Sequence, residues 1–193
     1  MSLKNLIISE INKNGPITIS RFMEFCLYHK KFGYYTSGKQ KIGASGDFIT
    51  APEISQVFGE LIGLWLAQIW IDQGKPKPFS LVELGPGNGT MMYDILRALK
   101  KVPHFTDAAS IVLVENSETL KTRQKCKLKD YSPIWIENVA DIPEQPLFLI
   151  ANEFLDALPT RQFRKNKNIW YERSVTLNKI NELQFIYLPS NLS

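Results

Sequence analysis

The segment Leu81–Gly89 constrains this chain more than any other, because an apolar run ends there in an acidic residue and a cluster of glycines. The run Leu81-Val-Glu-Leu84 is typical of a buried strand, and Gly85-Pro-Gly-Asn-Gly89 follows it directly. Glycine has no Cβ and adopts positive φ readily, so the backbone can pass close to a ligand there. The sequence therefore predicts a strand that ends in a ligand-binding turn and leads into a helix.

The glycine spacing distinguishes two kinds of nucleotide-binding turn. Gly85 and Gly87 match the first two positions of the dinucleotide fingerprint G-x-G-x-x-G, but Thr90 occupies its last position. The third glycine, Gly89, comes one residue early. A nicotinamide-dependent oxidoreductase is therefore disfavoured, although a preference for NAD in a binding assay would support it.

Glu83 lies inside the end of the predicted strand, and a carboxylate there suits a cationic group better than a pyrophosphate. We therefore expect a nucleoside that carries a positive charge, S-adenosylmethionine, as the cofactor. In this interpretation Gly85, Gly87 and Gly89 approach the cofactor, and Glu83 binds the amino end of its methionine moiety. The alternatives are a plain strand-to-helix turn and an ordinary strand-end carboxylate.

Strands and helices are predicted to alternate around this turn. Such alternation is typical of parallel strands joined by crossover helices, in a sheet covered on both faces. The predicted strands span residues 79–84, 111–115, 134–136 and 147–151, the helices 88–101 and 117–128, and an antiparallel hairpin 170–177 and 183–188. The fold class is therefore α/β, with a helical extension before the sheet and the hairpin after it.

Residues 1–75 are predicted to form the N-terminal helical and loop extension, and residues 76–193 the cofactor-binding domain. Pro52 is suited to open a helix after a long glycine-rich loop. The apolar stretch Ile54–Ile71 approaches the length of a membrane span but includes polar residues such as Glu60. We therefore expect a core helix with an apolar stripe. That stripe comprises Ile54, Phe58, Leu61, Ile62 and Trp65.

Further polar residues are predicted to lie near the cofactor. Glu115 ends the second predicted strand, where an acid commonly binds the ribose hydroxyls, and Asp141 follows the third, near the expected adenine. Solvated positions are the alternative for both. In the loop before the core helix, Asp47, Thr50 and Glu53 form a polar cluster that could fold over the cofactor as a lid.

The segment Asn152-Glu-Phe-Leu-Asp156 follows the fourth predicted strand. Ligands of parallel sheets bind beyond the carboxyl ends of the strands. Asn152, Glu153 and Asp156 are therefore candidate catalytic residues beside a methyl acceptor. Helix capping is an equal alternative, since Asn and Asp favour caps and turns.

Composition narrows the class of protein further. The formal net charge is +4, but the lysines are scattered, so we expect no nucleic-acid partner. The two cysteines and two histidines lack metal-ligand spacing, and Cys26 is expected to be a reduced core thiol. We see no secretory segment, expect no membrane insertion and predict a cytoplasmic location.

The motifs Cys26-Leu-Tyr-His29 with Gly33-Tyr-Tyr35, Gly46–Glu60, Glu83–Gly89 and Ala151–Pro159 occur in this order along the chain. Together they resemble the MidA-like family of class I S-adenosylmethionine-dependent methyltransferases, which includes a mitochondrial assembly factor for respiratory complex I. The resemblance implies a Rossmann-like fold and methylation of protein arginine, with a complex I-type subunit as substrate. Arginine stays protonated in proteins, so Glu153 and Asp156, with Glu53 behind them, would orient its guanidinium.

Members of that family look considerably longer, with further strands after the hairpin. The resemblance therefore covers an N-terminal half, with only the first four parallel strands of the sheet. The fourth strand would then be an exposed apolar edge, which invites pairing. Either a separate chain supplies the missing half of a split enzyme, or the chain is a non-catalytic remnant that binds the cofactor weakly.

Overall fold

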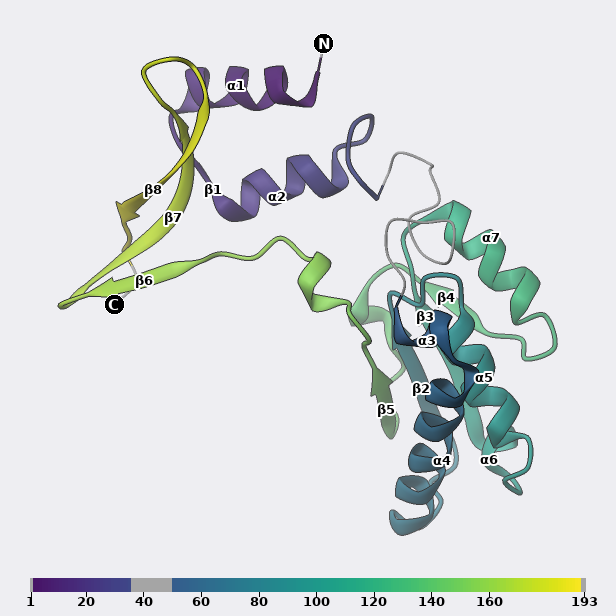
Figure 1. The fold of residues 1–193 in the computed structure, drawn as a ribbon. Coiled ribbons are helices and arrows are strands. Elements are labelled where there is room, and N and C mark those ends of the chain that lie inside the picture. The colour runs from purple at the N-terminus through teal and green to yellow at the C-terminus, as the bar shows by residue number, and fades with distance from the viewer. Residues whose placement is uncertain (1, 36–49, 192–193) are drawn as a thin grey trace. The chain divides into compact units, whose positions relative to one another are not determined.

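The computed structural model describes residues 2–35 and 50–191 (Figure 1). The chain forms two compact units. We call residues 40–155 the sheet unit, and residues 1–39 together with 156–193 the hairpin unit. The two ends of the chain thus fold together, and its middle forms the other unit.

The sheet unit is built on a parallel sheet with the order β4-β3-β2-β5. β2 (Phe79–Leu84) lies between β3 (Ala109–Val114) and β5 (Leu147–Ile150), and β4 (Ile134–Ile136) pairs with the other edge of β3. Every residue of β2 is buried, as its nearly continuous apolar sequence predicts for a strand covered on both faces. The predicted α/β fold with parallel strands is confirmed.

The helices of the sheet unit are α3 (Ala51–Ile54), α4 (Gln56–Asp72), α5 (Thr90–Leu99), α6 (Phe105–Ala108) and α7 (Glu118–Lys127), with a 3-10 turn at Val139–Asp141. The helix predicted to open at Pro52 is interrupted at Ser55, which is extended and caps α4 by accepting a hydrogen bond from the amide of Val57 at 3.2 Å. The core is centred on the ring of Phe79, which contacts the rings of Trp70, Phe105 and Phe148.

α4 packs on α5 through small residues rather than through the predicted apolar stripe. A Cβ on Gly59 would lie 2.7 Å from the Cβ of Asp94, and a Cβ on Gly63 would lie 3.0 Å from the carbonyl oxygen of Ile95. The two helices therefore approach so closely that only glycine fits at these positions. The inward orientation expected for the stripe is wrong for most of its bulky members. Ile54, Leu61 and Trp65 are 73%, 61% and 63% exposed, while Phe58 and Ile62 are half-buried.

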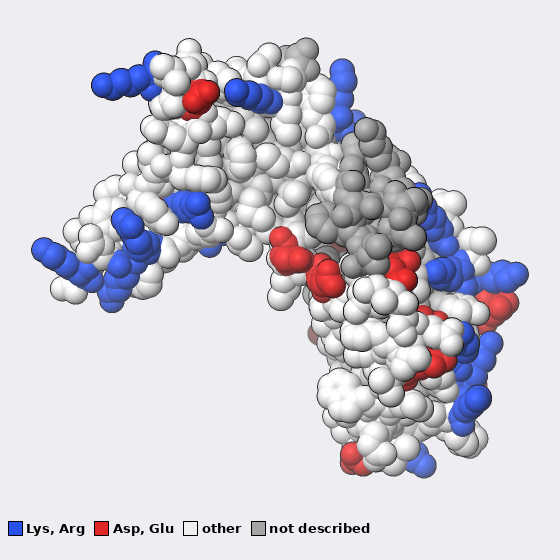
Figure 2. All heavy atoms as spheres, in the orientation of Figure 1, with Lys and Arg blue, Asp and Glu red and all other residues white. Residues whose placement is uncertain are grey.

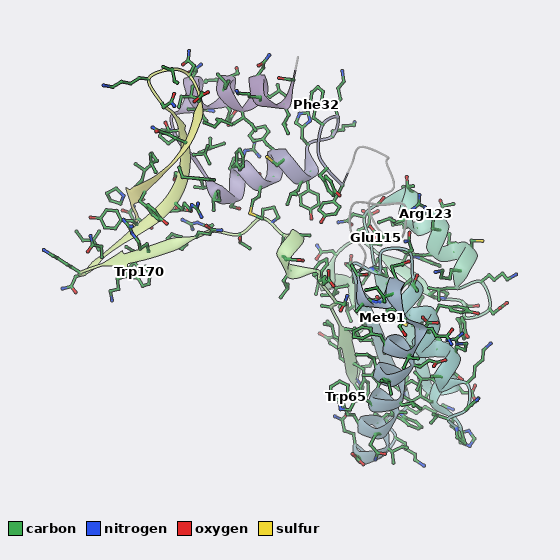
Figure 3. The ribbon with its side chains drawn as sticks, viewed as in Figure 1. Phe32, Trp65, Met91, Glu115, Arg123 and Trp170 are labelled. Carbon is green, nitrogen blue, oxygen red and sulfur yellow. The ribbon has the colours of Figure 1, made fainter. Side chains whose placement is uncertain are left out.

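The side of α4 that faces away from α5 is apolar as well. It carries Val57, Leu61, Leu64, Trp65 and Ile71, all exposed, and we call this set the outer face of α4. Trp65 projects outward from the helix (Figure 3). In Figure 2, Lys and Arg side chains gather over α7, whereas the surface over α4 is largely uncharged. A helix that is apolar all round is usually buried on all sides.

The hairpin unit contains α1 (Leu3–Asn14), β1 (Ile17–Thr18), α2 (Ile19–Tyr28), β6 (Phe163–Asn166), β7 (Ile169–Leu177) and β8 (Leu183–Pro189). β7 pairs antiparallel with β8, and with β6 and β1 in succession along its other edge. Ile7, Ile11, Ile17, Ile19 and Val175 form the core of this unit. The predicted hairpin is therefore confirmed, and it packs with the first two helices.

The compact units differ from the predicted ranges 1–75 and 76–193. α3 and α4 belong with the sheet, because α4 covers α5, whereas the hairpin shares a core with α1 and α2. Cys26 is half-buried in the hairpin unit, and burial raises the pKa of its thiol. Among the described residues, no helix combines the length and the apolar character that a membrane span requires.

Candidate cofactor site

The carboxyl ends of the parallel strands bring two predicted cofactor segments together. The amide of Gly85 donates to the carbonyl of Val114, and the amide of Glu115 donates to the carbonyl of Ile136, each at 3.0 Å. The glycine turn and Glu115 therefore follow neighbouring strands at the same edge of the sheet. Figure 3 labels Glu115 at this edge of the sheet.

The glycine turn adopts the backbone conformation that its sequence predicts. Gly85, Gly87 and Gly89 have φ of 61°, 54° and 75°, a region that other residues enter only with strain. Gly89 is the N-cap of α5, and its amide donates to the carbonyl of Pro86 at 2.7 Å. Gly85 is also needed for packing, because a Cβ there would lie 2.6 Å from the ring of Phe154. That contact holds the segment after β5 against the turn.

Glu83 is buried on β2, only 3% exposed, directly before this turn. Burial raises the pKa of its carboxyl from 4.5 to about 8, and a hydrogen bond from the backbone amide of Met92 opposes the shift. Its Oε2 atom has no hydrogen-bond partner among the described residues. A buried carboxyl with a free oxygen fits a cationic ligand group, since an opposite charge would compensate its ionisation.

Glu115 is half-buried just beyond the end of β3, and its two oxygens are held separately. Oε1 accepts a hydrogen bond from the amide of Ser117 at 2.7 Å, and Oε2 accepts one from Nε2 of Gln124 at 3.2 Å. Burial raises the pKa of the Glu115 carboxyl, while these hydrogen bonds oppose the rise. The carboxylate is thus fixed in orientation and retains lone pairs for hydroxyl donors.

Glu53 lies on α3 and contacts both the glycine turn and the first residue of α5. Its Oε1 atom accepts hydrogen bonds from the hydroxyl of Thr90 at 2.8 Å and from Nδ2 of Asn88 at 3.3 Å. The hydroxyl of Thr90 in turn accepts one from Nζ of Lys127 at 2.6 Å. Thr50 occupies the N-cap of α3 and makes no side-chain cap hydrogen bond. Glu53 therefore ties α3 to the turn.

The predicted acceptor residues are divided between the two units. Asn152 is half-buried and Glu153 is exposed with φ of 50°, and both belong to the sheet unit. Asp156 belongs to the hairpin unit, where the chain re-enters that unit after the sheet unit. Phe154, packed against Gly85, places the Asn152–Glu153 pair beside the glycine turn.

Two other predicted residues are less informative. Asp141 ends the exposed 3-10 turn that follows β4, at the same edge of the sheet as Glu115, and no contact links it to the glycine turn. Asp47 lies outside the described residues. Over residues 2–35 and 50–191, no cluster of His, Cys, Asp and Glu has the geometry of a metal site.

Gln124 and Phe154 contact the site, yet neither was predicted from the sequence. Gln124 is fully buried on α7, and its spacing from the buried Lys121 and Leu128 matches one helical face. That spacing could have indicated an inward side chain, but the hydrogen-bond partners come from distant segments. Phe154 lies in the polar segment Asn152–Asp156, and its sequence position does not indicate a contact with Gly85.

A parallel sheet with a glycine turn after its central strand and an acid after the next strand defines a nucleoside-binding α/β protein of the methyltransferase class. A family model described as "Putative S-adenosyl-L-methionine-dependent methyltransferase" matches residues 61–192. The chain belongs to this family. The predicted resemblance to MidA-like methyltransferases is confirmed, and the cofactor of the family is the predicted S-adenosylmethionine.

Curated relatives carry the name protein arginine methyltransferase NDUFAF7. The Xenopus laevis protein is 37% identical over 100% of this chain and 49% of its own length. The Caenorhabditis elegans homologue is 38% identical over 95% of this chain and 48% of its own length. The chain therefore spans about half the length of the curated relatives it matches.

A solved structure from Burkholderia thailandensis, described as a "likely methyl transferase" bound to S-adenosyl-homocysteine, is also similar. It has a TM-score of 0.79 and 29% identity, covering 99% of this chain and 50% of that one. The predicted fold class is thus shared with a protein that binds the product form of the cofactor.

The predicted cytoplasmic location is contradicted by these relatives. The proteins from Xenopus laevis, Caenorhabditis elegans and Homo sapiens are all named as mitochondrial. The prediction rests on the absence of a secretory segment, on a reduced Cys26 and on Glu10 within the first predicted helix, and none of these features distinguishes the cytoplasm from an organelle.

Proposed function

We propose that this chain binds S-adenosylmethionine and takes part in transferring its methyl group to arginine side chains of a protein. The family and the names of the curated relatives support this proposal. The proposal that the chain binds the cofactor rests mainly on Glu83. Its buried carboxyl lies directly before the glycine turn, and one of its oxygens has no hydrogen-bond partner among the described residues. That group is suited to the ammonium of the methionine moiety.

The other cofactor contacts follow from position. Glu115 would accept hydrogen bonds from the ribose hydroxyls, because its carboxylate is fixed and keeps acceptor capacity. The glycine turn would let the backbone approach the nucleoside, and Asp141 would border the adenine. Glu53 would hold α3, with Thr50 at its N-cap, against the turn, supported by its hydrogen bond with Thr90.

The methyl acceptor would lie beside Asn152 and Glu153, which Phe154 holds against the glycine turn. When bound, the cofactor would supply a methyl group for in-line transfer from its sulfonium sulfur to a guanidino nitrogen of the acceptor, which would lose one proton to solvent in exchange. Since arginine is protonated in proteins, the role of Glu153 is to orient the guanidinium through charged hydrogen bonds. A complex I-type subunit is the acceptor that the family resemblance suggests.

A second candidate, a half that needs a further polypeptide for activity, is favoured by the exposed edge of the sheet. Leu147 and Leu149 of β5 are 48% and 43% exposed, and among the described strands only β2 pairs with β5. The outer face of α4 is apolar and exposed as well. Exposed apolar edges and patches of this kind commonly mark interaction surfaces. A segment equivalent to the rest of the relatives would cover them, whereas a non-catalytic remnant would leave them bare.

The first test is isothermal titration calorimetry of the chain with S-adenosyl-homocysteine. Gly87→Val introduces a side chain into the turn at φ of 54°, and we expect it to abolish binding. Gly74→Val is the matched control, because Gly74 has φ of 81° and open space around it, far in sequence from the turn. Equal loss of binding in both variants, or none in either, would contradict the proposed site.

Methyl transfer is then measured by mass spectrometry of arginine peptides from a purified complex I-type subunit. A split enzyme predicts transfer only when the second half of a relative, such as the Xenopus laevis protein, is added. Cofactor binding without transfer in either condition would favour the remnant. Methylation at lysine or a carboxylate instead of arginine would contradict the proposed acceptor.

A further inference from the structure

Gln124 is the fully buried amide of α7, with none of its surface exposed. Burying an amide without hydrogen bonds is costly, so its partners explain why it is tolerated there. Nε2 donates to the carbonyl of Gly87 at 2.8 Å and to Oε2 of Glu115 at 3.2 Å, and Oε1 accepts from Nε1 of Trp135 at 2.8 Å. Both donor positions of the amide are thus used, together with one acceptor position.

These three partners belong to different segments of the sheet unit. Gly87 lies in the turn after β2, Glu115 follows β3, and Trp135 is on β4. A single side chain therefore links the carboxyl ends of three neighbouring strands. Gln124 also fills the space next to the N-cap of α5, because a Cβ on Gly89 would lie 3.3 Å from its Cγ.

The two bonds from Nε2 act on both predicted cofactor contacts at once. The bond to the Gly87 carbonyl fixes the plane of the peptide between Gly87 and Asn88, in the middle of the turn. The bond to Glu115 fixes one carboxylate oxygen while Ser117 holds the other. Without Gln124, the carboxylate would lose a donor that keeps it oriented, and the peptide would be free to rotate.

We propose that Gln124 is a positioning residue that sets the glycine turn and the Glu115 carboxylate in register for the ribose and the adjoining part of the cofactor. This inference rests on the proposed roles of the turn and Glu115. Gln124 would not touch the cofactor. It would act through Glu115, so its loss should weaken recognition of the ribose hydroxyls in particular.

The test compares binding of S-adenosyl-homocysteine and of its 2′-deoxyribose analogue by calorimetry. Gln124→Met keeps the length of the side chain but removes both donors, and Gln124→Glu keeps an acceptor for Trp135 if the methionine variant does not fold. Leu128→Ala is the structural control, since Leu128 is buried at the end of α7 and makes no side-chain hydrogen bond to the site.

We expect Gln124→Met to weaken S-adenosyl-homocysteine binding roughly tenfold or more, as for the loss of a hydrogen bond to a charged group. The ratio of its affinities for the ribose and the deoxyribose ligand should fall towards one. Leu128→Ala should lower the melting temperature and leave that preference intact. In a double-mutant cycle, Glu115→Gln should cost much less in the Gln124→Met background than in the original chain.

The outcomes separate this inference from the proposed function. Additive losses, or an unchanged preference in a folded Gln124→Met protein that binds more weakly, would overturn the positioning role and leave the cofactor site intact. Failure of the unaltered chain to bind S-adenosyl-homocysteine would overturn the proposed function, and the inference with it.

Discussion

Replacing Glu83 by glutamine should stabilise the cofactor-free protein while weakening its cofactor site. Burial raises the pKa of Glu83 from 4.5 to about 8. Between these values the folded protein holds a proton that the unfolded chain has released. The unfolded state therefore binds fewer protons, and stability falls as pH rises. The contribution of the protonated carboxyl is full below about pH 4.5 and is lost as pH rises through about 8.

The magnitude follows from this rise in the pKa of Glu83. Each pKa unit corresponds to about 1.4 kcal/mol, so the unfolding free energy at pH 7 is lowered by up to about 3 kcal/mol relative to pH 4. Glutamine keeps an acceptor for the amide of Met92 but never ionises, so Glu83→Gln should recover that amount at pH 7. For a chain of this size the melting temperature should rise by about 6–12 °C.

The assay is urea denaturation of the cofactor-free protein at intervals from pH 5 to 8.5. The difference in stability between Glu83→Gln and the unaltered chain should grow with pH up to about 8 and then level off. Glu144→Gln is the matched control, because Glu144 is exposed on a loop of the same unit. A difference that is constant with pH, or a variant less stable throughout, would refute the buried protonated carboxyl.

Three further predictions concern packing and charge. Gly85→Ala should cost about 1–3 kcal/mol of stability in thermal unfolding, because a Cβ there meets the ring of Phe154, and Phe154→Ala should relieve part of that cost. Gly63→Leu should destabilise the sheet unit by more than about 2 kcal/mol in urea, since the leucine would push α4 away from α5. Arg161 lowers the pKa of Glu172 by a two-pronged hydrogen bond, so their contribution to stability is present above the ordinary glutamate pKa and is lost as pH falls. Glu172→Gln should therefore reduce the loss of stability on acidification from pH 6 to 3.

A stability loss in Gly85→Ala that Phe154→Ala leaves unchanged would show that backbone strain, and not the ring, requires the glycine. For Gly63→Leu, unaltered stability would contradict the close approach of α4 to α5. Acid sensitivity that is the same with and without the Glu172 carboxyl would contradict the ion pair as its cause.

Features encoded locally were predictable from the sequence. The apolar run of β2, its terminal acid and the three glycines with positive φ lie within nine consecutive residues, and their pattern specifies both strand and turn. The alternation of strands and helices predicts that the strands pair in parallel, and this pairing places Glu115 beside the turn. Glu53 was predicted close to the cofactor, and the structure gives it a contact with Thr90 that no spacing could indicate.

Features that depend on a packing partner were not predictable. Gly59 and Gly63 determine the orientation of α4, because they allow α5 to approach closely. The prediction considered only the spacing of the bulky apolar residues, which does not show this contact. The hairpin joins α1 and α2 because Val175 completes a core with Ile7 and Ile11, across most of the chain length. The hydrogen bonds of Gln124 were likewise not predictable, because its partners lie in segments that come together only in the folded sheet.

The most direct test of the cofactor site is the proton balance of ligand binding. S-adenosyl-homocysteine should be titrated at pH 7 in buffers with different heats of ionisation. With a pKa of about 8, Glu83 is largely protonated before binding, and its ionisation opposite the ligand ammonium should release close to one proton per ligand. The account predicts that release, and its disappearance in Glu83→Gln together with weaker binding. Tight binding without proton release, or an unchanged release in the variant, would contradict the role of Glu83.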